Sequence, residues 1–300
     1  MLILSGKSER SEILDLNTDQ CNQILEETYD TFAEGFGGKI DDSTIIVCQR
    51  EDGRKCLTIE TIDLKPKLLN FELGKVRTRG SSIAFKTKDG QSVLWITGGR
   101  NATDATDLFD DSELVSTEGT TQGPKLPYPL RSHCLVKINM TTVLLLGGNN
   151  GTAYPRETWF YHTSGTKSKG PMMLNGRVRF GCQTVLHEEE KFVLVVGGYI
   201  AGNYIDTVEI LDLKNNEWKN GPSFPFRVRH PTMVKSRNQN GEEETLLLGG
   251  RNYDLNPSAN SDKIFRFECG QMVNQEDCQW VELQRKMQLP RRQNIVIPIR

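Results

Sequence analysis

The segment Phe192–Pro222, FVLVVGGYIAGNYIDTVEILDLKNNEWKNGP, contains the pattern that decides the fold. Five apolar residues run into Gly197-Gly198, a polar loop follows, and a second apolar run leads to Trp218 and then Gly-Pro. Short runs rich in Val and Ile that are bounded by turn residues are typical of β-strands. Glycine has no Cβ, so a strand that ends in two glycines can take unusual φ and ψ angles and let a neighbouring backbone come close.

The same order of features recurs along the chain about every fifty residues. Apolar runs end in glycine pairs whose second glycines are residues 99, 148, 198 and 250, so the intervals are 49, 50 and 52 residues. Two earlier runs, LILSG (2–6) and STIIVCQR (43–50), occupy the same place in the order but lack the pair. Each unit continues with a polar loop, a second apolar run, a turn that often contains Gly-Pro, and a run preceded by arginine. Six units of four strands are the signature of a β-propeller.

The two ends of the chain complement each other. The chain opens in a run that corresponds to the second strand of a unit, and it ends in RRQNIVIPIR (291–300), which corresponds to a first strand. We expect residues 295–299 to join residues 2–4, because closure of the ring covers both strand edges. The predicted fold is an all-β, six-bladed β-propeller with four antiparallel strands per blade. We expect one domain over residues 1–300, with blade 1 at 1–33 plus 293–299, blade 2 at 34–78, blade 3 at 79–130, blade 4 at 131–178, blade 5 at 179–228 and blade 6 at 229–292.

These residues resemble the kelch repeat, in which a glycine pair is followed by a hydrophobic strand, a tryptophan and an Arg-led strand. The resemblance covers the whole chain and is strongest over residues 179–229, and Trp218 and Trp280 occupy the place of the family's tryptophan. The resemblance implies a scaffold for protein binding. Because the ring uses all 300 residues, we expect a free-standing platform without the adaptor domains that are often fused to kelch repeats.

Composition narrows the class of protein. A net charge of −2 argues against a general nucleic-acid binder, which would usually have a basic domain. No apolar run approaches the roughly 18 residues of a membrane span. The start MLILSGKSER lacks the basic region of a signal peptide. We therefore expect a soluble, monomeric, cytoplasmic protein that binds neither nucleic acid nor membrane, and an extracellular one if a signal lies upstream.

Basic residues gather on one predicted face of the ring. The loops after the second strands and before the first strands emerge on the same side, which we call the mouth face. The opposite face carries acidic hairpins at 41–42, 188–190 and 242–244. The second arginine of each pair, such as Arg177 or Arg227, is expected to be a solvated charge. The candidate partner-binding residues on the mouth face are Arg131, Arg179, Arg229, Arg79, Arg292, Arg100, Arg251 and Arg50.

Arginine suits carboxylates because its planar guanidinium binds both carboxylate oxygens. In kelch propellers that read acidic peptides, arginines of this kind do the binding, so the resemblance points to Arg131, Arg179 and Arg229. The alternative for these three is a structural one, in which they pair with backbone or acidic groups between blades. The sequence predicts a protein–protein interaction module whose basic face recognises an acidic segment of a partner.

The alternative function is carbohydrate binding or a sugar-mutarotase-like activity in the central mouth, with Glu34 as a candidate acid. The sequence does not decide whether the protein is an enzyme, but it favours a non-enzyme, so no catalytic residue, cofactor or metal is assigned. The loop 101–113 holds Asp104, Asp107, Asp110 and Asp111, which could surround a cation. Their spacing matches no calcium loop, so a solvated or partner-facing loop is favoured.

Seven cysteines leave two possibilities open. Cys48 and Cys56 flank a turn, and Cys269 and Cys278 flank a polar stretch, so each pair could form a disulfide across a hairpin. Cysteine is also a common buried apolar residue, and we favour free thiols. An extracellular domain with both disulfides is the remaining alternative.

Overall fold

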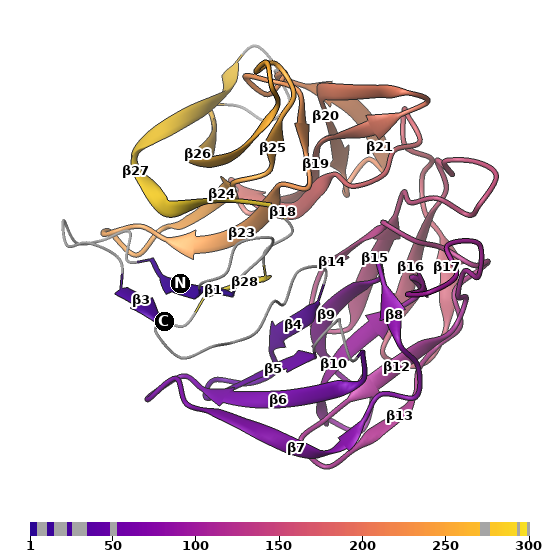
Figure 1. Cartoon of the computed structure of the whole chain (residues 1–300). Coiled ribbons are helices and arrows are strands. Elements are labelled where there is room, and N and C mark those ends of the chain that lie inside the picture. Colours follow the sequence, from indigo (N-terminus) through magenta and orange to yellow (C-terminus); the bar gives the residue numbers. More distant parts are fainter. Residues whose placement is uncertain are drawn as a thin grey trace.

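The computed structural model describes residues 1–4, 11–14, 23–25, 35–48, 53–270, 277–292 and 295–298. The regular elements in these residues are β-strands, and they form six main antiparallel sheets arranged as the blades of a propeller (Figure 1). The first three sheets, each from its inner to its outer strand, are β28 (Ile295–Ile297), β1 (Leu2–Leu4), β2 (Ser11–Ile13) and β3 (Gln23–Leu25); β4 (Phe36–Lys39), β5 (Thr44–Cys48), β6 (Lys55–Glu60) and β7 (Pro66–Glu72); and β9 (Ser81–Lys86), β10 (Ser92–Thr97), β12 (Ser112–Val115) and β13 (Thr120–Gln122).

Blades 4 to 6 have the same order of strands, and short extra strands extend blades 3 and 6 towards the mouth face. β8 (Arg77–Thr78) pairs with β11 (Arg100–Asn101), and β22 (Val228–Arg229) pairs with β25 (Arg251–Asn252). The three sheets are β14 (Cys134–Lys137), β15 (Thr142–Leu146), β16 (Thr158–His162) and β17 (Lys167–Lys169); β18 (Gly181–His187), β19 (Glu190–Ile200), β20 (Asn203–Asp212) and β21 (Glu217–Gly221); and β23 (Thr232–Arg237), β24 (Glu243–Leu248), β26 (Ala259–Cys269) and β27 (Cys278–Arg291).

The C-terminal strand closes the ring. β28 runs antiparallel to β1, with Leu2 opposite Ile297 and Leu4 opposite Ile295. β1 and β28 therefore lie side by side in one sheet, as Figure 1 shows. This confirms the closure predicted from the sequence, and it covers the edges that β1 and β28 would otherwise expose.

The apolar runs are long because each blade packs against a neighbour on both faces. In β19, Val193 and Val195 pack with blade 4, where they meet Leu144 and Leu146. The alternating Leu194 and Val196 pack with blade 6, where they meet Leu247 and Phe265. Side chains of a strand point alternately to the two faces of its sheet. A strand buried on both faces is therefore apolar throughout, and periodicity alone could not show which neighbour each residue contacts.

The glycine pairs have the role that the sequence suggested. Gly197 has φ of +64° and Gly198 of +104°, in a region that other residues rarely adopt. A Cβ on Gly197 would lie 2.6 Å from the carbonyl oxygen of Val228, at the entry to the next blade. A Cβ on Gly198 would lie 2.6 Å from the carbonyl oxygen of Val178. The pair is required both by its own dihedral angles and by the close approach of neighbouring backbone.

The tryptophan of one blade contacts the Gly-Pro turn of the preceding blade. Trp218, in β21, donates a hydrogen bond from Nε1 to the carbonyl oxygen of Pro171, at 3.0 Å. Trp280, in β27, donates in the same way to Pro222, at 3.2 Å. Each tryptophan thus ties the outer strand of its own blade to the turn of the preceding blade.

The preference for free thiols is wrong for six of the seven cysteines. Cys48–Cys56 and Cys269–Cys278 form disulfides across their hairpins. A third disulfide, which the sequence analysis missed, joins Cys134 of β14 to Cys182 of β18. These two cysteines are 48 residues apart, but the propeller places the inner strands of blades 4 and 5 side by side, with Cα atoms 6.4 Å apart.

Candidate functional site

A chain of backbone hydrogen bonds links blades 3 to 6 around the mouth. Ser132 N donates to Arg79 O at 2.6 Å, Arg179 N to Ser132 O at 3.2 Å, and His230 N to Arg179 O at 2.8 Å. These four residues have φ angles of +59°, +55°, +59° and +57° in chain order, although none is glycine. Such backbone conformations persist only where the surroundings hold them. Here the bonds to the neighbouring blades do so, and they fix the rim from which the arginine side chains project.

The predicted arginines occupy two different positions in the repeat. Arg79 and Arg179 belong to this rim. Arg131 and Arg229 stand one residue earlier, where they pair with the residues that follow the glycine pairs of their own blades, Asn149 and Arg251. Arg131 and Arg229 are therefore offset by one position in the repeat from Arg79 and Arg179. Side chains from both positions nevertheless reach the same mouth.

The charges of four predicted arginines lower the pKa of one histidine at the rim, His230. Burial, and then the charges of the guanidinium groups, hold the pKa of His230 well below its usual value. The sequence separation of these arginines is large, but the ring brings them together. In order of their effect, the four are Arg179, Arg229, Arg292 and Arg79.

Three arginines and three tyrosines enclose a pocket on the mouth face, which we call the tyrosine–arginine pocket. It has a volume of about 280 Å³. The arginines come from the segments before blades 4, 5 and 6. Tyr154 comes from the loop after Gly148, and Tyr199 and Tyr204 come from the ends of β19 and β20 that follow Gly197-Gly198. Its walls are Arg131, Arg179, Arg229, Tyr154, Tyr199 and Tyr204, with Asn149, Ser132 and Val178 between them.

The tyrosine rings form a continuous row along the mouth. Tyr154 lies edge-on to Tyr199 at 6.2 Å between ring centroids, and Tyr199 lies 5.3 Å from Tyr204. Tyr204 in turn stacks on Tyr253, with centroids 3.4 Å apart. These tyrosines were not predicted as site residues. The available signal was that four of the seven tyrosines fall within six residues after a glycine pair.

Arg229 is held by this row. Its guanidinium lies 5.4 Å from the ring centroids of both Tyr204 and Tyr253, and its Nη1 donates to the Tyr204 hydroxyl at 3.3 Å. Its buried Nε has no hydrogen-bond partner among the described residues. Arg131 donates to the carbonyl oxygen of Ala105 at 3.4 Å. Burial, and then the charge of Arg100, lower the pKa of Arg131. Within the part of the chain that the structure describes, neither Arg131 nor Arg229 forms an ion pair.

The remaining candidates contribute less directly. Arg251 donates to the hydroxyl and the carbonyl oxygen of Ser258, both at 3.0 Å, so it stabilises its own loop. Arg100 pairs with Thr78 in the extra strand of blade 3 and lies close enough to Arg131 to affect its pKa. Arg50 and Glu34 lie outside the described residues.

The second arginines are not solvated charges in blades 1, 3 and 5. Arg177 is fully buried, and its Nη2 lies 2.5 Å from Oε1 of Glu209, which is also fully buried. Arg77 pairs in the same way with Glu113 at 2.7 Å, and the third such pair is Arg291 with Glu12 at 3.7 Å. Arg227 alone matches the prediction in being half exposed, although it pairs with Asp254.

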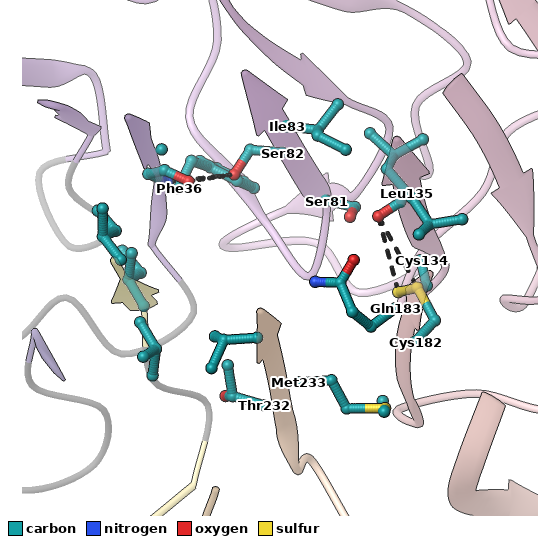
Figure 2. A pocket seen from close by; sticks show the side chains of 18 of the residues that line it. Phe36, Ser81, Ser82, Ile83, Cys134, Leu135, Cys182, Gln183, Thr232 and Met233 are labelled. Atoms are coloured by element: carbon teal, nitrogen blue, oxygen red, sulfur yellow. Dashed lines mark hydrogen bonds between the residues drawn. A yellow bond between two sulfur atoms is a disulfide. The ribbon is translucent and has the colours of Figure 1, made fainter. Parts of the chain in front are cut away.

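The central channel lies below the rim and has a volume of about 570 Å³. The inner strands of all six blades line it, and Figure 2 shows lining residues such as Leu135, Gln183 and Met233 around it, near the Cys134–Cys182 disulfide. Lys39, Lys137 and Lys235 line the channel at the ends of their strands. The acidic hairpins predicted for the opposite face therefore surround lysines, and the charge there is mixed.

The aspartate loop does not gather its carboxylates. Asp111 pairs with Arg77 at 3.1 Å, Asp110 with Lys125 at 3.6 Å, and Asp107 accepts a hydrogen bond from Asn101. Among the described residues no group of His, Cys, Asp or Glu is placed to hold a metal ion. The described part of the chain also has no helix with the length and apolar character needed to cross a membrane.

Comparisons with known proteins agree with this architecture. Residues 193–225 match the family model of the Kelch motif. The fold is similar to the solved structure of YjhT, with a TM-score of 0.70 and 15% sequence identity over 91% of this chain and 89% of that one. The comparison with curated proteins gives no match. The repeat, the six blades and the Kelch motif together identify the chain as a kelch-repeat β-propeller.

Proposed function

We propose that the chain is a protein-interaction module whose mouth face binds an acidic segment of a partner protein. A kelch propeller supports a binding module in general. The observation that carries the finer proposal is the tyrosine–arginine pocket, which three arginines line together. Two of them, Arg131 and Arg229, make no ion pair with any described residue.

The chemistry of the pocket favours carboxylates over neutral groups. A guanidinium presents a planar pair of N–H donors that matches both oxygens of a carboxylate. Walls of low dielectric constant strengthen the field of clustered charges and attract oppositely charged ligands. Arginine and tyrosine are also the residues that most often dominate the energy of protein interfaces, especially where they lie near the centre of the contact.

Carbohydrate binding is the second candidate, and the row of tyrosine rings favours it because aromatic faces can pack against apolar ligand surfaces. A mutarotase would also need an acid or base in the site. The described residues that line the tyrosine–arginine pocket include no Asp or Glu, so we assign no catalytic role.

The disulfides bear on the compartment. Disulfides persist in oxidising environments and are rare in the cytosol. The three found here favour the extracellular alternative over the cytoplasmic prediction. A thiol count on the unfolded, unreduced protein should give one free thiol of the seven cysteines, and a count of seven would contradict this placement.

The experiment is a binding screen with a library of acidic peptides, a matched library with Gln and Asn in place of Glu and Asp, and a panel of sugars. We expect binding to the acidic library only, and weaker binding as salt rises from about 50 to about 300 mM because the charges are screened. The Arg131→Gln/Arg229→Gln variant should lose about 2 kcal/mol or more of binding free energy, about 30-fold in affinity.

The matched control is Arg237→Gln, which removes the same charge from an exposed arginine that donates to Gly241 in the β23–β24 hairpin. This variant should bind the peptides as the wild type does. Equal affinities for the wild type and the double variant, or an equal loss in the Arg237→Gln control, would overturn the proposal. If the protein binds a sugar and binds no acidic peptide, the result would favour the second candidate, carbohydrate binding.

A further inference from the structure

The tyrosine–arginine pocket specifies more than a general attraction to acidic residues. We infer that it binds a tetrahedral oxyanion ester, the phosphate or sulfate group of a modified tyrosine, within the partner's acidic segment. The inference rests on the proposed function and names the group that enters this pocket. Phosphate and sulfate esters share the chemistry that the pocket recognises, and they differ in charge.

Donors reach the pocket from several directions. Arg131, Arg179 and Arg229 come from three successive blades. Three tyrosines also line the pocket: Tyr154 from the loop after Gly148, and Tyr199 and Tyr204 from β19 and β20. A carboxylate has two oxygens in one plane, and a single guanidinium can satisfy both. A tetrahedral ester has three terminal oxygens that point apart, so it can accept from groups on several sides at once. The pocket therefore offers more hydrogen-bond donors than one carboxylate needs.

The charge of the pocket agrees with a strong anion. None of the described residues that line it is an Asp or Glu, and the charge of Arg100 also lowers the pKa of Arg131. Arg229 is oriented by two aromatic rings that attract its charge without neutralising it. Its buried Nε has no partner among the described residues, and buried donors are normally satisfied. A group with three acceptor oxygens can supply such partners.

The size of the pocket limits what can enter. A volume of about 280 Å³ accommodates one side chain with its terminal group. The row of Tyr199, Tyr204 and Tyr253 continues along the mouth, where an aromatic ring that carries the ester can pack edge-on against the rings.

The experiment uses one acidic peptide sequence, taken from the strongest binders in the library, with four residues at its central position. These are tyrosine, 4-carboxyphenylalanine, sulfotyrosine and phosphotyrosine. The ring is the same in all four, so the comparison isolates the planar monoanion, the tetrahedral monoanion and the tetrahedral dianion. We expect both esters to bind at least about tenfold more tightly than the planar carboxylate, which is about the effect of one further hydrogen bond to a charged group. The more tightly bound ester identifies the modification.

The Arg131→Lys/Arg229→Lys variant keeps both charges but removes the planar donor pairs. In this variant the preference for the esters over 4-carboxyphenylalanine should fall to about twofold or less, since lysine is a point charge. Tyr204→Phe, which removes the hydroxyl that receives the Arg229 hydrogen bond, should reduce the preference without changing the charge. This milder variant tests the site if the double variant does not fold.

The outcomes separate the two proposals. Equal binding of the esters and the planar carboxylate, with binding still dependent on Arg131 and Arg229, overturns this inference and leaves the proposed function standing. Failure of every acidic peptide to bind overturns both. A preference for the esters that persists in the lysine and Tyr204→Phe variants places the tetrahedral group elsewhere and overturns the assignment to this pocket.

Discussion

The buried ion pair between Arg177 and Glu209 should be a large contributor to the stability of the propeller. Both side chains are inaccessible to solvent, and Nη2 lies 2.5 Å from Oε1. Arg177 also donates to the carbonyl oxygens of Gly197 and Thr207, at 3.1 and 2.9 Å. Glu209 accepts from backbone N–H groups in the segment that precedes blade 5. The pair therefore ties the entry segment of blade 5 to two of its strands.

Replacing Arg177 with Met keeps much of the side-chain volume and leaves the carboxylate of Glu209 buried without its cation. Removing one partner of a buried ion pair costs about 3–5 kcal/mol, because the remaining charge is neither hydrated nor paired. The matched control is Arg54→Met. Arg54 lies 2.6 Å from Glu72, but the two side chains are 46% and 43% exposed. An exposed pair contributes about 0–1 kcal/mol, so the control should have little effect.

The assay is urea unfolding, followed by tryptophan fluorescence and circular dichroism on the wild type and both variants. The unfolding midpoint and the slope together give the change in free energy. A double-mutant cycle with Arg177→Met and Glu209→Leu should show strong coupling, because both residues belong to one network. A loss of less than about 1 kcal/mol in Arg177→Met, equal to that of the exposed control, would refute the reasoning.

Three further predictions concern the rim and the blades. Gly197→Ala should lower the free energy of unfolding by more than about 1–2 kcal/mol, which is the cost of a left-handed conformation alone. The new Cβ would also lie 2.6 Å from the carbonyl oxygen of Val228. Gly202→Ala, also at positive φ but with no atom within 4 Å of the new Cβ, is the control in the same unfolding assay. Burial lowers the pKa of His133 to about 3, so below about pH 6.5 the unfolded state binds a proton that the folded state does not. Relative to His133→Gln, the wild type should lose about 1.4 kcal/mol of unfolding free energy per pH unit between about pH 6 and 4.5. Parallel plots of unfolding free energy against pH for the two proteins would contradict this. The Cys134–Cys182 disulfide closes a loop of 48 residues, and the variant with Ala at both positions should lose about 4 kcal/mol by the chain-entropy relation, whereas an unchanged melting temperature would show that the bond contributes nothing.

The fold was predictable because its main signals are local and repeated. A glycine pair recurs at the second strand in four of the six units, and two incomplete ends imply a closed ring. The pair follows the strand in blades 3, 4 and 6, whereas in blade 5 β19 continues through Gly197-Gly198 to Ile200 after a register shift. The position of Trp218 in the repeat was predictable, but its hydrogen-bond partner was not. Its hydrogen bond to Pro171 joins residues 47 apart, and only the packing of neighbouring blades brings them together.

The site was less predictable, for two physical reasons. The segments before the inner strands have no hydrophobic alternation, so the sequence does not fix their register, and Arg131 and Arg179 were aligned although they differ by one position. Burial of an arginine depends on a carboxylate elsewhere in the blade. Glu209 lies 32 residues after Arg177, and no motif in the sequence between them predicts the ion pair. The Cys134–Cys182 disulfide was missed for the same reason, since each cysteine lies in an ordinary inner strand.

The central claim is that an acidic segment binds at the arginines of the mouth face. The most direct measurement is protection from phenylglyoxal, a reagent that modifies accessible guanidinium groups, read by mass spectrometry with and without a saturating acidic peptide. We predict that the peptide protects Arg131 and Arg229 and leaves the labelling of Arg237, which is exposed in the β23–β24 hairpin, unchanged. Unchanged labelling of Arg131 and Arg229 in the presence of the bound peptide would contradict the account.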